Sequence, residues 1–415
     1  MRAAVALAAL ILSMPAVAAD YPVVDTGQAR CYDDSGPIAC PRPGARFFGQ
    51  DAQVEGTQPR LRDNGDGTVS DLVTGLMWER AFHRDISFAG APADAARARA
   101  GGHADWRVPT IKELYSLIRF DGATGTAGPG RGGAPADARP YLDTGAFAFE
   151  YPARGRYIDA QYVTATAYGG RVMDGRAAFF GVNFADGRIK GYPQDGGPGR
   201  RGWYARYVRG NPAYARNDFA DAGDGTVTDR ATGLTWTTAD SGGGLDWEGA
   251  LAWCEGLELA GHADWRLPNA KELHSIVDYS RSPDATGSAA IDPVFAISEI
   301  RDDEGRRDWP FFWTSTTHLD GRRPGDFAVY IAFGRALGYM PRGGPRGGGP
   351  RMGPPGMGGP ESIRDTTGMV LMDVHGAGAQ RSSPKAGDQS RLPKGAGPQG
   401  DVLRINNHAR CVRGG

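Results

Sequence analysis

The sequence predicts two homologous domains in tandem, each built from short strands, two helices and long loops. Two observations lead to this prediction. Four blocks of sequence occur twice in the same order, and the 63 glycines and 29 prolines favour turn-rich domains over helix bundles. Because the repeat unit is far longer than a solenoid repeat, each copy is expected to be a whole domain.

The four repeated blocks set the expected boundaries. They are GDGTVSDLVTGLMW (65–78) and GDGTVTDRATGLTW (223–236), GGHADWRVPTIKEL (101–114) and AGHADWRLPNAKEL (260–273), YVTAT (162–166) and FWTST (312–316), and ARYVRG (205–210) and ARCVRG (409–414). We expect a first domain at 61–210, a linker at 211–216 and a second domain at 217–414. An N-terminal segment at 20–60, which contains two cysteines, precedes them.

Residues 1–19 are typical of a signal peptide. Arg2 supplies the positive charge, the stretch from Ala3 to Ser13 is mostly apolar, and small residues up to Ala19 offer a cleavage site. No later stretch approaches the roughly 20 apolar residues that a membrane span needs. The net charge is −1, so no global field attracts nucleic acid. We therefore expect an exported protein, periplasmic or extracellular, that binds no nucleic acid.

An exported chain can form disulfides, and the sequence contains four cysteines. Cys31 and Cys40 lie close together and are expected to pair locally. Cys254 and Cys411 belong to the second copy, and both are replaced in the first copy, by Ala95 and Tyr207. Their joint absence is what a bonded pair predicts, because a lone partner would be a free thiol in an oxidising compartment.

Each copy is expected to open with a β-meander, because alternating residues are interrupted by Gly-rich turns such as Asn64–Gly67. Two helices follow. Asp246 is a good N-cap for the first helix of copy two, and copy one has the alanine-rich stretch 91–100. The second helix begins with a capping box in both copies, Thr110 to Glu113 and Asn269 to Glu272. The acidic turn lacks the ligand pattern of an EF-hand, so a structural hairpin is favoured over a calcium loop.

The residues shared by both copies are expected to be scaffold. Trp78 and Trp236 are expected to face the core, and Trp106 and Trp265 to fill it. Arg107 and Arg266 are expected to pair with a carboxylate or to bind backbone carbonyls. Glu113 and Glu272 complete the capping boxes. His103 and His262 could be metal ligands, but no second ligand lies at a recognisable spacing, so a turn-stabilising role is favoured. No metal site and no cofactor are predicted.

The C-terminal half of each copy is predicted to be strand and loop, with buried strands at 162–166 and 312–316. The segment 341–360 is rich in glycine and proline and is expected to be a disordered insertion within the second domain. Ser382 to Gly400 is expected to be a second mobile loop.

These blocks resemble the Lcl C-terminal domain family, a bacterial exported module similar to C-type-lectin-like folds. The resemblance implies an α+β fold, with two helices packed on small antiparallel sheets and long loops that carry any ligand site. It also implies surface adhesion or recognition, with sulfated polysaccharides among the ligand classes. The E-P-N, Q-P-D and W-N-D strings of calcium-dependent lectins are absent from the sequence, so calcium-mediated sugar binding is not expected.

Loops after the third block differ between the copies and are the predicted ligand site. Arginine forks suit carboxylate and sulfate groups. The candidates in copy two are His318, Asp320, Arg322, Arg323 and Arg335, and those in copy one are Tyr168, Arg171 and Arg188. The alternative is an ordinary solvated charged loop.

Three classes of function remain open. The first is a non-catalytic binding or adhesion protein whose partner is a glycan, an acidic polysaccharide or another envelope protein. The second is an enzyme of the formylglycine-generating-oxidase type, which relies on a reactive cysteine pair. The third is a structural component of an envelope assembly. No catalytic motif is present, so a binding protein is the favoured hypothesis.

Overall fold

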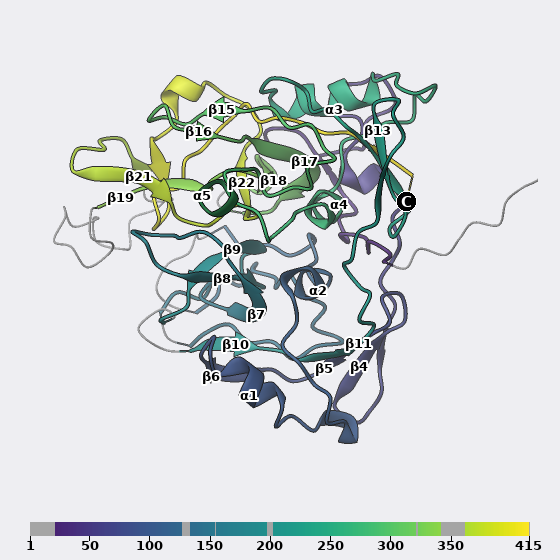
Figure 1. The fold of residues 1–415 in the computed structure, drawn as a ribbon, viewed down its shortest axis with the longest axis vertical. Coiled ribbons are helices and arrows are strands. Elements are labelled where there is room, and N and C mark those ends of the chain that lie inside the picture. Colours follow the sequence, from purple (N-terminus) through teal and green to yellow (C-terminus); the bar gives the residue numbers. More distant parts are fainter. Residues whose placement is uncertain are drawn as a thin grey trace, which may run out of the picture.

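The computed structural model describes residues 21–126, 133–153, 155–196, 202–320, 323–341 and 362–414. The predicted signal peptide and nearly all of the insertion at 341–360 lie outside the described residues. Among the described residues, no helix is long and apolar enough to cross a membrane. Short helices and many short strands make the fold α+β with a dominant β part (Figure 1).

The N-terminal segment and copy one contain these elements: β1 (Cys31–Tyr32), β2 (Pro37–Ile38), a 3-10 helix (Asp51–Gln53), β3 (Leu61–Asp63), β4 (Thr68–Asp71), β5 (Leu76–Glu79), β6 (His83–Ile86), α1 (Ala91–Ala95), a 3-10 turn (Ala100–Gly102), α2 (Ile111–Tyr115), β7 (Gln161–Ala167), β8 (Ala178–Asn183), β9 (Arg188–Pro193), β10 (Trp203–Ala205) and β11 (Val208–Gly210).

Copy two contains β12 (Phe219–Asp221), β13 (Thr226–Asp229), β14 (Leu234–Thr237), α3 (Trp247–Glu255), α4 (Ala270–Ser275), α5 (Pro283–Thr286), β15 (Ile300–Arg301), β16 (Arg307–Asp308), β17 (Phe311–His318), β18 (Phe327–Ala332), β19 (Leu337–Pro341), β20 (Ser362–Ile363), β21 (Met369–Asp373), β22 (Gln380–Pro384), a 3-10 helix (Gln389–Arg391), β23 (Gly395–Ala396) and β24 (Val412–Arg413).

The predicted meander is confirmed in both copies. Strands β3, β4 and β5 pair antiparallel, and β11 closes the sheet against β5 with Val208 opposite Trp78. Strands β12, β13, β14 and β24 form the matching sheet, with Val412 opposite Trp236. Both tryptophans are fully buried, so the first and fourth sequence blocks meet around one core residue in each copy.

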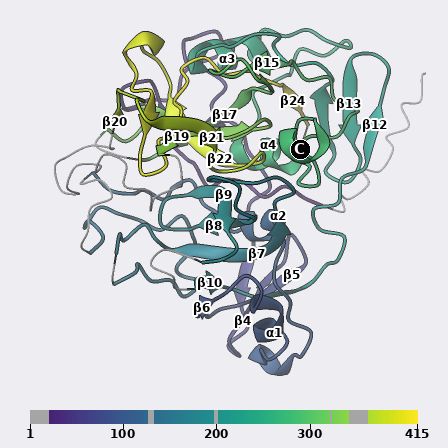
Figure 2. The same cartoon turned by 60° about the vertical axis from the view of Figure 1, so that its left-hand side comes forward.

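One sheet runs through both copies, in the order β17-β18-β22-β9-β8-β7-β10-β6. Three strands of copy two and three of copy one occur in mirrored order, and they join where Gln380 on β22 pairs antiparallel with Ile189 on β9. Figures 1 and 2 show the two copies stacked across this junction, with copy one blue to teal and copy two green to yellow. The copies are therefore related by an approximate twofold axis.

Strand β22 corrects the expectation that Ser382 to Gly400 is a mobile loop. The strand lies inside the shared sheet, paired with β18 on one side and β9 on the other. Its sequence, QRSSP, carries no apolar run, and so the pattern of hydrophobic residues could not reveal a buried strand. The hairpin of β19 and β21 lies between β18 and β22 along the chain.

Both predicted disulfides are confirmed. Cys31 pairs with Cys40 in the N-terminal segment, and Cys254 on α3 pairs with Cys411 beside the last strand. The N-terminal segment itself packs between the copies. The side-chain amide of Gln28 donates to the carbonyl of Phe120 in copy one (3.3 Å) and to that of Thr317 in copy two (2.8 Å).

Candidate functional site: the cleft between the two copies

The arginine and glutamate of the second block form the same unit in each copy. Arg107 makes a two-pronged ion pair with Glu113 (2.8 and 2.5 Å), and Arg266 does so with Glu272 (2.7 and 2.6 Å). Each glutamate also accepts the N-cap amide, from Thr110 or Asn269, at 2.8 Å. The predicted capping boxes and the predicted arginine–carboxylate pairs are confirmed, and together they fix where α2 and α4 begin.

The lysine of the same block connects the two copies. Lys112 on α2 donates to the carbonyl of Ser275 at the end of α4 (2.7 Å), and Lys271 on α4 donates to the carbonyl of Ser116 just after α2 (2.9 Å). These two bonds are equivalent under the approximate twofold. Between them, the equivalent rings of Tyr115 and His274 lie 4.3 Å apart. The second block therefore supplies the interface between the copies as well as the start of each helix.

Burial controls the ionisation of these lysines. Desolvation lowers the pKa of Lys112 to about 8, while Asp229 and Asp278 oppose the shift. Desolvation likewise lowers the pKa of Lys271 to about 7. Each ammonium group donates only to neutral oxygens. The second acceptor of Lys112 is the side-chain oxygen of Asn217 (3.0 Å), and that of Lys271 is the carbonyl of Asp25 (2.8 Å).

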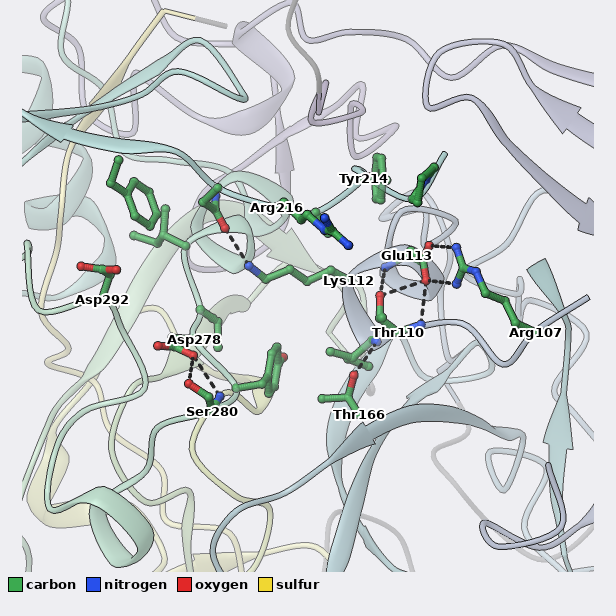
Figure 3. Close-up of a pocket in the computed structure, with 18 residues that line it drawn as sticks. Arg107, Thr110, Lys112, Glu113, Thr166, Tyr214, Arg216, Asp278, Ser280 and Asp292 are labelled. Carbon is green, nitrogen blue, oxygen red and sulfur yellow. Dashed lines mark hydrogen bonds and ion pairs between the residues drawn. The ribbon is translucent and has the colours of Figure 1, made fainter. Parts of the chain in front are cut away.

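A cleft of about 650 Å³ opens beside Lys112, at the junction of the copies (Figure 3). This volume is in the range of ligand sites. Copy one supplies the start of α2 and the end of β7, the linker at 211–216 supplies one wall, and copy two supplies the chain after α4. The lining residues are Arg107, Thr110, Ile111, Lys112, Glu113, Thr166, Pro212, Tyr214, Ala215, Arg216, Asn217, Phe219, Ile276, Val277, Asp278, Tyr279, Ser280 and Asp292.

Arg216 is the lining residue best placed to meet a ligand. Its side chain is exposed, and among the described residues no carboxylate or carbonyl pairs with its guanidinium group. The three acidic groups of the lining each have a partner. Glu113 holds Arg107, Asp278 accepts the amide and the hydroxyl of Ser280 (2.9 and 2.6 Å), and Asp292 accepts the amide of Val294 (2.9 Å). An unpaired guanidinium beside a half-buried lysine suits an anionic ligand.

Four of the predicted ligand residues lie in the interface between the copies. Asp320 pairs with Arg188 and accepts the hydroxyl of Thr124 (2.6 Å). His318 contacts the carbonyl of Asp186 at 2.9 Å. Tyr168 donates its hydroxyl to Asp373 at 2.7 Å. The sequence suggested that these residues lie in exposed loops, but in the structure they make contacts between the copies. The pairing of β22 with β9 brings the two loops face to face.

Burial governs the charges of this interface. Desolvation lowers the pKa of His318 to about 3, so the imidazole stays neutral, while Arg188 holds the pKa of Asp320 well below its usual range against the effect of burial. A neutral histidine and a closed arginine–aspartate pair are features of a structural contact.

The other predicted ligand residues lie elsewhere. Arg335 pairs with Asp284 (2.5 Å) and lies near Asp308 (3.7 Å). Arg171 is exposed, and Arg323 is 77% exposed beside Asp326. Arg322 lies outside the described residues. Of the predicted residues that the structure describes, Arg171 and Arg323 are exposed, and Arg323 makes an ion pair with Asp326 (3.3 Å).

Sequence reasoning did not single out Lys112, Thr166, Tyr214 or Arg216 as site residues. Lys112 carried a signal, because it occurs in both copies of the second block. Tyr214 and Arg216 belong to the segment interpreted as a plain linker, and no pattern marks them. Among the described residues, no group of three or more His, Cys, Asp or Glu side chains could hold a metal ion.

Comparison with known proteins decides the family. The sequence model of the Lcl C-terminal domain matches residues 67–209 and 225–344, which together cover more than half of the chain. The chain belongs to the Lcl C-terminal domain family, in two tandem copies. No curated protein and no solved structure matches it significantly.

Proposed function

We propose that this protein is an exported, non-catalytic binding protein and that the cleft between the copies is its ligand site. The observation that carries the proposal is the unpaired guanidinium of Arg216 in a cleft of about 650 Å³. Both copies and the linker contribute walls, so the complete site depends on the tandem arrangement. This dependence supports binding as the purpose of the duplication.

The proposed ligand is an acidic polysaccharide or another glycan. Arg216 and Lys112 offer positive charge, and the rings of Phe219 and Tyr279 offer apolar faces beside it. Ligand sites commonly combine a few placed polar groups with aromatic walls. A C-type-lectin-like fold, which the family resemblance suggests, is consistent with a glycan ligand, but fold does not determine function.

An oxidase of the formylglycine-generating type is the alternative enzyme. That chemistry requires a reactive cysteine pair, whereas Cys254 and Cys411 are joined between a helix and the last strand, with both side chains fully buried. Cys31 and Cys40 form the other bond. A structural role in an envelope assembly is compatible with the same surfaces, and binding partners would distinguish it.

A glycan array with and without a chelator tests the proposal. We expect acidic glycans to bind in both conditions, and Arg216→Glu to weaken the binding by about tenfold, the scale of a lost charged hydrogen bond. Arg171→Glu is the matched control, because this exposed arginine lies outside the cleft lining. Binding lost with Arg171→Glu and kept with Arg216→Glu would move the site to the loops that the sequence suggested. A blank array would favour the assembly role.

A further inference from the structure

The third block places an equivalent threonine beside the second helix of each copy. The hydroxyl oxygen of Thr166 accepts the amide of Ile111 at 3.0 Å, and that of Thr316 accepts the amide of Ala270 at 2.9 Å. Each hydroxyl therefore has one proton left to donate. The two sites differ in what receives that proton.

In copy two, the protein's own N-terminal segment occupies the site. The hydroxyl of Thr316 donates to the carboxylate of Asp51 (2.5 Å), which also accepts the hydroxyl of Thr26 (2.8 Å). The next residue is held as well, because the side-chain amide of Gln28 donates to the carbonyl of Thr317 and accepts its amide, each at 2.8 Å. These contacts bury the end of β17 completely.

In copy one, the equivalent site is open. Ala165 and Ala167 at the end of β7 are exposed, and Thr166 is half-buried on the wall of the cleft. Among the described residues, no acceptor receives the hydroxyl proton of Thr166.

The chain just after the linker fills only the lysine side of this site. Asn217 meets Lys112 as the carbonyl of Asp25 meets Lys271. Among the described residues, none accepts a hydrogen bond from Thr166 as Asp51 does from Thr316, and the chain continues from Asn217 into β12.

We infer that the cleft of copy one receives an acidic segment of a partner polypeptide, with an aspartate or glutamate carboxylate on the hydroxyl of Thr166. This inference rests on the proposed function in taking the same cleft as a binding site, and it names a polypeptide in place of a glycan as the partner. The occupant of the equivalent site is itself a polypeptide, which uses one carboxylate and one side-chain amide. Copy one adds Arg216 at the same cleft, and a cation there favours an acidic partner over a neutral one.

The probe is a fluorescein-labelled peptide of residues 46–55, RFFGQDAQVE, which carries Asp51 and its neighbours. Fluorescence anisotropy with the full chain should show saturable binding. The matched peptide with Asp51→Ala should bind about tenfold more weakly, because it lacks the carboxylate. Equal binding of the two peptides would overturn the inference, and no protein variant is needed for this comparison.

Hydrogen exchange locates the peptide. We expect the amides of residues 165–167 to gain protection when the peptide is added, and protection confined to other segments would contradict the inference. Thr166→Val should reduce binding as strongly as Asp51→Ala does in the peptide, while Thr166→Ser should retain it. The serine variant separates loss of the hydroxyl from damage to α2, whose first amide relies on the same oxygen.

The glycan array distinguishes failure of this inference from failure of the proposed function. Acidic glycans that bind through Arg216 while the peptide does not bind would leave the proposed function standing and remove the peptide partner. If neither class binds, both proposals fail. Peptide binding without glycan binding would support the inference and identify the protein as one that binds other proteins.

Discussion

The hydroxyl of Tyr207 donates a hydrogen bond of 2.7 Å to Asp94 on α1, at the place where copy two has its disulfide. Tyr207 is the equivalent of Cys411, and Asp94 precedes Ala95, the equivalent of Cys254. His83 lies over the Tyr207 ring and bonds the same carboxylate (2.8 Å). Copy one therefore joins its first helix to its last strand by hydrogen bonds instead of a covalent bond.

Removing the Tyr207 hydroxyl tests this replacement. Tyr207→Phe should lower the free energy of unfolding by about 1.5 to 3 kcal/mol, since one hydrogen bond to a charged group is lost while the ring still packs. Urea denaturation measures it. Tyr204→Phe is the control: its hydroxyl also bonds a carboxylate, Glu150 at 3.0 Å, but that carboxylate is 37% exposed, against 19% for Asp94. A change for Tyr207→Phe no larger than that of the control would contradict the proposed role.

The disulfides of the chain should contribute unequally to stability. Cys254 and Cys411 close a loop of 157 residues, and Cys31 and Cys40 one of 9. The loop-entropy relation gives about 5 kcal/mol for the long loop and about 3 for the short one. Paired serine substitutions, Cys254→Ser with Cys411→Ser against Cys31→Ser with Cys40→Ser, should show this order in denaturant unfolding. The reverse order would mean that native-state contacts, rather than chain entropy, set the contribution of each bond.

The fourth block predicted a shared strand, but it did not predict what its first arginine does. Arg206 donates to the carbonyls of Glu79, Arg80, Ala81 and Ala148, and Arg410 to those of Thr237, Thr238 and Ala296. Both side chains are fully buried. A buried arginine bonded only to carbonyls leaves no mark in a hydrophobic pattern, and only its repetition suggested importance.

Arg410 should be among the least replaceable residues of copy two. Arg410→Met leaves three carbonyls without their donor, and we expect a loss of about 3 kcal/mol or more in unfolding free energy. Arg413→Met is the matched control in the same block. Its ion pair with Asp264 (2.8 Å) is partly exposed, and its loss should cost about 0.5 kcal/mol. Similar losses for the two variants would show that the carbonyl contacts do not carry the stability.

Contacts within one copy could be predicted from the sequence, whereas contacts between the two copies could not. Capping boxes, meanders and both disulfides were predictable, because each is set by local spacing or by comparing the copies. The partners of Lys112, Arg188 and Asp320 were not. These residues meet groups more than 50 positions away, and a sequence pattern within one domain carries no information about how two domains face each other. For that reason, loops that were predicted to bind a ligand lie in the interface between the copies. The segment that was interpreted as a plain linker forms one wall of the cleft.

The carboxyl group of Asp51 should make the stability of the chain depend on pH. Burial raises its pKa to about 7, with Asp25 and Glu272 adding to the effect, and the hydroxyls of Thr316 and Thr26 opposing it. The folded state therefore binds a proton that the unfolded state, with a pKa near 3.9, has released. This contribution is complete below pH of about 4 and is lost as pH rises through about 7.

Asp51→Asn tests this dependence, because the amide stays neutral and its oxygen can still accept both threonine hydroxyls. Urea unfolding of both chains from about pH 4.5 to about pH 7.5, an interval that lies mostly between the two pKa values, should show the stability of the variant rising relative to that of the wild type as pH rises. The gain is about 1.4 kcal/mol for each unit by which the pKa is raised. Asp388→Asn is the control, since that exposed carboxylate has a lowered pKa and should give no such gain. A difference between Asp51→Asn and wild type that stays constant with pH would mean that Asp51 remains ionised when folded.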